Sequence, residues 1–128
     1  MMTFTIVALG TIIVSSCNKP STNPPVITFS NTVGYICEDT TLYRGTNYTF
    51  WVYATKNGGD DLVESGKISR SVNGGPDSVL QTMSFVTTQF SQYYSYNAAD
   101  SGTVAKYTFT FGNQNGLTSS ASIKITSN

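Results

Sequence analysis

From residue 26 onward, apolar and polar residues alternate along the chain in separate stretches. Within residues 48–56, one face of a strand would carry Tyr48, Phe50, Val52 and Ala54. The opposite face would carry Thr49, Trp51, Tyr53 and Thr55. Residues 103–111 alternate in the same way. A period of two predicts β-strands with one buried face. The apolar spacing of an amphipathic helix is not found in this part of the sequence.

The end of the chain predicts a β-hairpin. Residues 117–126 form a further alternating stretch, and "GNQNG" separates them from the strand before. Asn and Gly tolerate the positive φ that tight hairpin turns require. Weaker strands are predicted at 25–29, 34–38, 66–72, 77–88 and 90–98.

Strands at this regular spacing, with Gly, Asn and Asp between them, are typical of a sandwich or barrel. We expect an all-β fold, an immunoglobulin-like β-sandwich of about seven antiparallel strands over residues 26–128. The side chains expected in its core are Phe29, Phe50, Val52, Ile68, Phe85, Tyr107, Phe109, Ile123 and Ile125.

The first 16 residues have a different character. Residues 4–14, "FTIVALGTIIV", are an uncharged run that is too short to span a bilayer as a helix and long enough for the apolar part of a secretory signal. "MMTFT" lacks the Lys or Arg that such signals usually carry near the N-terminus. The alternative is that residues 3–14 are a buried strand or helix of the domain.

The sequence Val14-Ser15-Ser16-Cys17 resembles the lipobox of bacterial lipoproteins. This resemblance implies that residues 1–16 are a signal peptide and that Cys17 carries a thioether-linked diacylglycerol, with the protein anchored at the outer membrane, on its periplasmic face or at the cell surface. Two or three acyl chains hold a protein on a bilayer. Residues 17–25 are polar and rich in proline, so we expect a flexible tether. If the alternative for residues 3–14 holds, Cys17 is an ordinary thiol.

The stretches "YRGTNYTFWVYA", "KISRSVNGG" and "GTVAKYTFTFGNQNGLTSSASIKIT" resemble the Ig-like and PKD-like modules of bacterial surface and periplasmic lipoproteins. The resemblance covers most of residues 26–127. It implies a non-catalytic module. With Cys17 used for lipidation, Cys37 has no partner for a disulfide, and we expect it to be a small buried apolar residue.

The composition argues against several function classes. Seven Lys and Arg balance seven Asp and Glu, so no basic face is available for nucleic acid. The chain has no histidine to act as a general base or metal ligand. The carboxylates fall mostly in predicted turns, and Asn57, Asp60 and Asp61 are too few ligands for Ca²⁺. We therefore expect no enzyme activity, no cofactor and no metal.

The aromatic residues are the most informative candidates for a binding site. Eight Tyr, seven Phe and one Trp occur in this small chain. Trp51 and Tyr53 share the face opposite the predicted core, and Tyr93, Tyr94 and Tyr96 crowd one short strand. They are candidate contacts for a glycan or another envelope protein. The alternative is that Trp51 fills space in the fold and that tyrosines simply favour strands.

We therefore expect a lipid-anchored envelope protein that acts as a non-catalytic binding or structural module. Two alternatives are a subunit of a surface assembly joined by β-strand augmentation and a carbohydrate-binding accessory module.

Overall fold

The computed structural model describes residues 23–58 and 61–128, which contain eight β-strands. They are β1 (Val26–Phe29), β2 (Thr40–Leu42), β3 (Asn47–Thr55), β4 (Val63–Val72), β5 (Ser78–Thr87), β6 (Gln89–Asn97), β7 (Val104–Asn113) and β8 (Thr118–Ser127). Among these residues, no helix is long and apolar enough to cross a membrane. The predicted signal peptide at residues 1–16 and the predicted lipidation of Cys17 concern positions outside the described residues.

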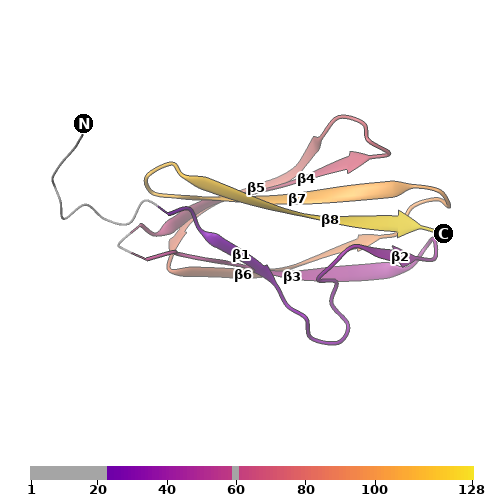
Figure 1. The fold of residues 1–128 in the computed structure, drawn as a ribbon, viewed down its shortest axis with the longest axis horizontal. Helices are drawn as coiled ribbons and strands as arrows, with labels where there is room; N and C mark the ends of the chain where they lie inside the picture. The colour runs from indigo at the N-terminus through magenta and orange to yellow at the C-terminus, as the bar shows by residue number, and fades with distance from the viewer. Residues whose placement is uncertain (1–22, 59–60) are drawn as a thin grey trace, which may run out of the picture.

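The strands form two stacked sheets (Figure 1). One has three strands in the order β1-β3-β6, and the other has five in the order β2-β8-β7-β4-β5. The first matches the A-B-E strands of an immunoglobulin-like sandwich, and β8-β7-β4 matches its G-F-C strands. The predicted all-β sandwich is confirmed. It has eight strands rather than about seven, and one pairing, between β2 and β8, is parallel.

The predicted strands agree with the structure except around residues 34–38. There the chain forms a loop between β1 and β2, with Gly34 at a φ of 101° and Val33 98% exposed. The backbone N–H of Ile36 donates to the carbonyl of Thr49 on β3. The prediction of a strand at 34–38 is wrong. These residues form a loop that contacts β3, and they do not pair with β3 in a ladder of backbone hydrogen bonds. The three residues of β2 are too short to show an alternating pattern.

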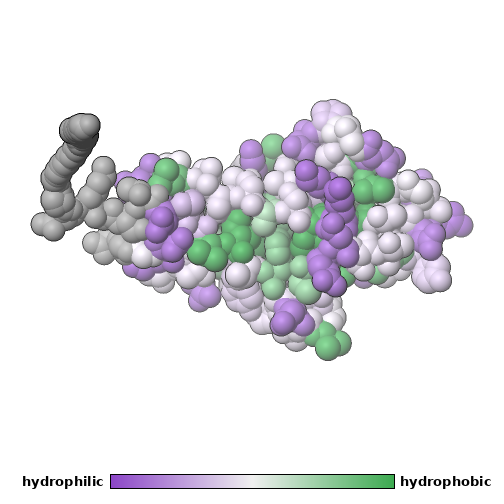
Figure 2. Space-filling model, viewed as in Figure 1, coloured by the Kyte–Doolittle hydropathy of each residue, from purple (hydrophilic) through white to green (hydrophobic). Residues whose placement is uncertain are grey.

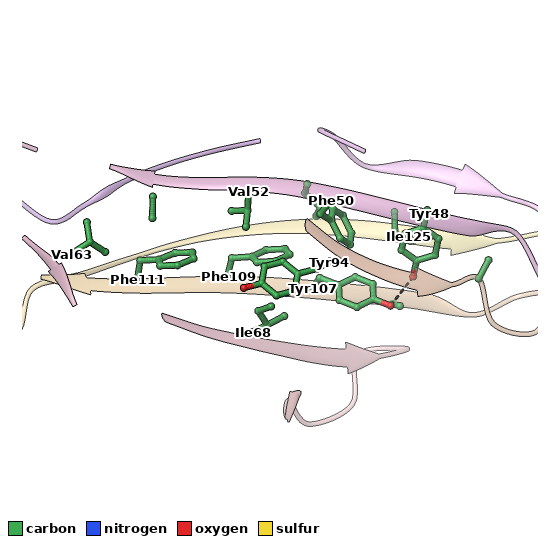
Figure 3. Packing of buried hydrophobic residues seen from close by; sticks show 14 residues of the cluster. Tyr48, Phe50, Val52, Val63, Ile68, Tyr94, Tyr107, Phe109, Phe111 and Ile125 are labelled. Carbon is green, nitrogen blue, oxygen red and sulfur yellow. Dashed lines mark hydrogen bonds between the residues drawn. The ribbon is translucent and has the colours of Figure 1, made fainter. Parts of the chain in front are cut away.

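The core lies between the two sheets and is largely aromatic (Figure 3). In β3, alternate residues are buried from Tyr48 to Ala54, as the sequence predicts. Of the nine predicted core residues, seven are buried, while Phe29 and Phe85 are partly buried against the core. These two lie on β1 and β5, which are edge strands, so solvent reaches one side of each ring.

Rings from both sheets meet edge to face at the centre of this core. Phe50 of β3 lies 5.4 Å from Phe109 of β7 between ring centroids, and Tyr48 lies 6.1 Å from Tyr107. Each such side chain contributes roughly 1.5–3 kcal/mol when fully buried. The hydroxyls of Tyr48 and Tyr107 share a 2.6 Å hydrogen bond, which Figure 3 shows as a dashed line. Their polar ends are therefore paired inside the sandwich.

The predicted hairpin between β7 and β8 is confirmed. Gly116 has a φ of 82°, which a residue with a side chain rarely adopts. Asn113 is buried, and its Oδ1 accepts the backbone N–H groups of Asn115 and Leu117 at 2.9 and 3.0 Å. The turn is thus held by a side chain inside the protein.

Residues 23–25, which the tether prediction included, are held against this hairpin. The Nδ2 of Asn113 donates to the carbonyl of Asn23 at 3.1 Å, and the hydroxyl of Ser119 donates to the carbonyl of Pro25 at 2.5 Å. Pro25 is buried. The end of the predicted tether therefore belongs to the folded domain.

Candidate functional site

The outer face of the three-stranded sheet carries a cluster of four aromatic rings. Trp51 and Tyr53 lie on β3, Tyr93 lies opposite Trp51 on β6, and Tyr35 comes from the loop between β1 and β2. We call these four residues the aromatic platform. The rings on β3 and β6 point away from the core because they occupy the strand positions between the buried ones.

The rings of the aromatic platform are in mutual contact. Ring centroids are 5.0 Å apart for Trp51 and Tyr93, 5.2 Å for Trp51 and Tyr53, and 5.3 Å for Tyr35 and Trp51. Tyr35 stacks on Tyr93 at 5.7 Å with an interplanar angle of 27°. These distances fall in the range of favourable aromatic pairs. Trp51 therefore touches each of the other three rings.

Backbone hydrogen bonds hold the loop that supplies Tyr35. Ser30 donates to the carbonyl of Trp51 and Ile36 donates to the carbonyl of Thr49, both at 2.9 Å. Tyr35 itself donates to the carbonyl of Thr32 at 3.1 Å. The loop thus follows β3 beyond the end of β1 and lays Tyr35 over the sheet.

Polar side chains fix the orientation of the indole ring. The Nε1–H of Trp51 donates to the hydroxyl of Ser91 at 2.9 Å, and Thr49 and Ser95 share a 2.8 Å hydrogen bond on the same face. An indole has only this one donor. Because this donor is used within the protein, the indole has no N–H left to donate to a ligand.

Tyr93 is the most open ring of the aromatic platform, with 52% of its surface exposed. The pKa of its hydroxyl is raised above the usual value, first by desolvation and then by the nearby Tyr35 and Tyr53. It is therefore neutral at physiological pH. The four aromatic side chains form a surface that contains no Lys, Arg, Asp or Glu.

The structure separates the five aromatic residues that the sequence singled out. Trp51, Tyr53 and Tyr93 share the outer face, but Tyr94 and Tyr96 point to the core and so are not part of this surface. Tyr94 is 7% exposed, and its hydroxyl donates to the sulfur of Met83 at 2.7 Å. Tyr96 stacks on Tyr107 at 4.7 Å. Successive residues of a strand face opposite sides, so one strand cannot present all three tyrosines together.

Burial also raises the pKa of Tyr94, to about 12, and that of Tyr96, in each case with a neighbouring tyrosine as the second cause. Sequence reasoning missed Tyr35, because it assigned residues 34–38 to a strand. No local signal in the sequence places this loop across β3.

A second surface feature is an open groove of about 890 Å³ along the seam between β1 and β8. Ile27 and Phe29 line one side, and Ala121 and Ile123 line the other. Figure 2 shows apolar side chains gathered along this seam. Cys37 also lines the groove and is an exposed free thiol, so the expectation that it is buried is wrong. The loop carrying it lies outside the sheets.

Residues 23–58 and 61–128 contain no group of three His, Cys, Asp or Glu side chains that are close enough to hold a metal ion. Asp61 is buried, and its Oδ1 accepts a 2.6 Å hydrogen bond from Asn115. Asp60, which the sequence grouped with Asp61 and Asn57, lies outside the described residues.

No protein-family model matches the sequence, and no curated protein matches it. A solved structure to which the chain is similar is the sporulation control protein Spo0M from Bacillus subtilis, with a TM-score of 0.45 and 11% sequence identity. The match covers 83% of this chain and 51% of that chain, so this chain spans about half of that protein. The similarity at this level adds nothing to the description of the site.

Proposed function

We propose that this chain is a lipid-anchored, non-catalytic binding module of the bacterial envelope, and that the aromatic platform is its contact surface for a glycan. The observation that carries the proposal is the contact of Trp51 with three further rings on an outer sheet face. Clustered aromatic rings outside the core are typical of contact surfaces.

A glycan suits this surface better than a charged ligand. The platform residues are neutral, and the indole N–H is already bonded to Ser91. The C–H groups on the flat face of a pyranose ring match the negative face of an aromatic ring. Affinity of this kind rests on ring contact and is insensitive to salt, whereas a charged ligand would be screened.

The anchor is supported by the sequence Val14-Ser15-Ser16-Cys17. We expect the membrane-bound protein to lack residues 1–16 and to carry acyl chains on Cys17. Intact mass measurement of the membrane fraction checks this, with Cys17→Ser as the variant that stays unacylated. An unmodified chain that retains residues 1–16 would refute the anchor and leave the platform to be tested separately.

The platform is tested by replacing Trp51 with Ala and measuring retardation in native gels that contain xylan, β-glucan, mannan or peptidoglycan fragments. We expect Trp51→Ala to lose at least about tenfold in affinity, or about 1.4 kcal/mol, because it removes the ring that touches the other three. Tyr43→Ala is the matched control, since Tyr43 is 76% exposed and lies off the platform.

Tyr93→Ala serves as a second variant because this ring is half exposed and its loss disturbs the fold least. Circular dichroism and urea unfolding show whether each variant is folded. Equal binding by the parent, Trp51→Ala and Tyr93→Ala, or no binding to any of the four glycans, refutes the proposal.

A further inference from the structure

The two sheets expose four edge strands, and they differ in how well they are protected. β1 and β6 border the three-stranded sheet, and β2 and β5 border the five-stranded sheet. An unpaired edge presents backbone N–H and C=O groups to any extended chain that approaches it. Proteins usually protect such edges with short strands, bulges, prolines or charged side chains.

Three of these edges have a protective feature. β1 has four residues and β2 has three. β5 has ten, but its pairing with β4 is interrupted by register shifts between Val63 and Ser65 and between Ile68 and Ser69. Bulges of this kind twist an edge and disrupt its ladder.

β6 lacks all of these features. It pairs with β3 in one unbroken register over nine residues, from Gln89 opposite Thr55 to Asn97 opposite Asn47. It contains no proline and no charged residue. None of the 14 charged residues of the chain lies between Asp77 and Asp100. The charged residues on described strands are Glu64, Lys67, Arg70, Lys106 and Lys124, all on β4, β7 or β8. Each of these three strands has a neighbour on both sides.

We propose that the free edge of β6 pairs with β6 of a second copy of this chain, antiparallel and about a two-fold axis. A two-fold interface uses the same patch on both copies. An uncharged strand meets its own copy without repulsion, which is the reason for choosing a second copy as the occupant. The two three-stranded sheets then become one continuous sheet.

The register of this pairing follows from the faces of β6. Residues directly opposite each other in an antiparallel pair point to the same side of the sheet. In a two-fold pair, one residue therefore lies opposite the same residue of the second copy, and the axis passes midway between the two. Tyr93 is the middle residue of Gln89–Asn97. With the axis there, Tyr93 lies against Tyr93 of the second copy on the outer face, and Gln92 lies opposite Tyr94 on the inner face.

This arrangement covers part of Tyr93 and brings the two aromatic platforms side by side. Cross-strand aromatic pairs add to the stability of a sheet. The dimer therefore offers one contact surface that is made of both platforms. The inference rests on the edge alone and does not depend on which ligand the platform binds.

The test compares the same substitution on the two long edges in the full chain. Gln92→Lys places an ammonium group on β6, and Gln81→Lys places one on β5; both glutamines are exposed. Sedimentation equilibrium is run from about 1 μM to about 500 μM protein, a range that detects dissociation constants from about micromolar to nearly millimolar. All three proteins carry the same N-terminal residues, so association through that segment would be equal in each.

We expect the parent and Gln81→Lys to dimerise and Gln92→Lys to weaken the dimer at least tenfold, because Lys on an edge opposes strand pairing. A parent that is monomeric throughout overturns the inference. So does a Gln92→Lys variant that associates like the parent, or a loss of association in Gln81→Lys alone.

A crosslink gives a second measurement that does not depend on how Gln92→Lys folds. In Tyr93→Cys, the two introduced thiols face each other across the axis, at a separation that suits a disulfide. We expect oxidation to give a disulfide that joins the two copies at position 93, identified by peptide mass mapping. Links through Cys37 with none through position 93 overturn the proposed register and edge.

Discussion

At the scale of single residues, the pair Tyr48 and Tyr107 shows how an aromatic core accommodates polar atoms. Their hydroxyls bond to each other at 2.6 Å inside the sandwich, where Tyr48 is 5% and Tyr107 is 1% exposed. Burial, followed by this hydrogen bond, raises the pKa of Tyr48 far above its ordinary value. Each hydroxyl can be buried at low cost because the other hydroxyl is its hydrogen-bond partner.

We expect Tyr48→Phe to destabilise the domain by about 1–3 kcal/mol, since it leaves the Tyr107 hydroxyl buried without this partner. The double variant Tyr48→Phe/Tyr107→Phe should regain part of that loss, because no polar atom of the pair then remains. Urea unfolding of the parent, both single variants and the double variant measures the coupling. Strictly additive losses would show that the hydrogen bond contributes nothing specific.

At the scale of elements, the turn between β7 and β8 depends on Asn113. This side chain accepts two backbone N–H groups of its own turn and donates to the carbonyl of Asn23. It therefore links the hairpin to the first described residues of the domain. The sequence suggested the turn through "GNQNG", and the structure shows that a buried amide holds it.

We expect Asn113→Ala to cost about 2–4 kcal/mol of the free energy of unfolding, since three hydrogen bonds of a buried side chain are lost together. The control is Gln114→Ala, at the exposed neighbouring position, where one 3.3 Å hydrogen bond from the Leu62 N–H is lost and the destabilisation should stay below about 1 kcal/mol. Thermal and urea unfolding compare the two. Equal losses would show that the Asn113 contacts do not determine the stability of the hairpin.

How much of these elements the sequence predicts depends on their length and pattern. The long strands such as Asn47–Thr55 alternate clearly, and so the sequence places their buried and outer faces correctly. Thr40–Leu42 is too short for a pattern, and its parallel partner β8 lies at the far end of the chain. The sequence predicts only part of the aromatic platform, because alternation along β3 places Trp51 and Tyr53 on the outer face. The β3–β6 register brings Tyr93 to them, and the path of the loop brings Tyr35.

At the scale of the whole molecule, the buried tyrosines link stability to pH. The pKa values of Tyr48, Tyr94 and Tyr96 are raised in the folded protein, that of Tyr94 to about 12. Tyrosines of an unfolded chain ionise near pH 10. Above that pH the unfolded chain loses protons that the folded chain retains, so the equilibrium moves towards unfolding.

We therefore expect stability from these groups to be fully present below about pH 10 and to fall between about pH 10 and about pH 12. The slope is up to about 1.4 kcal/mol per pH unit for each tyrosine that stays protonated in the fold. Urea unfolding at about pH 8 and about pH 11, with tyrosinate absorbance as a second signal, measures the effect. Tyr94→Phe should reduce the slope, and a stability that is unchanged at the higher pH would contradict this account.

The two ends of the described chain lie at opposite ends of the long axis of the sandwich (Figure 1). Asn23 and Pro25 are fastened at the β7–β8 turn, while Asn128 exchanges backbone hydrogen bonds with Leu42 and Arg44 at the other end. The first and the last described residues of the domain are therefore separated by its full length. A reporter protein fused after Asn128 would be carried one full sandwich length away from whatever holds the N-terminal side, and its accessibility to an external protease would read out that distance.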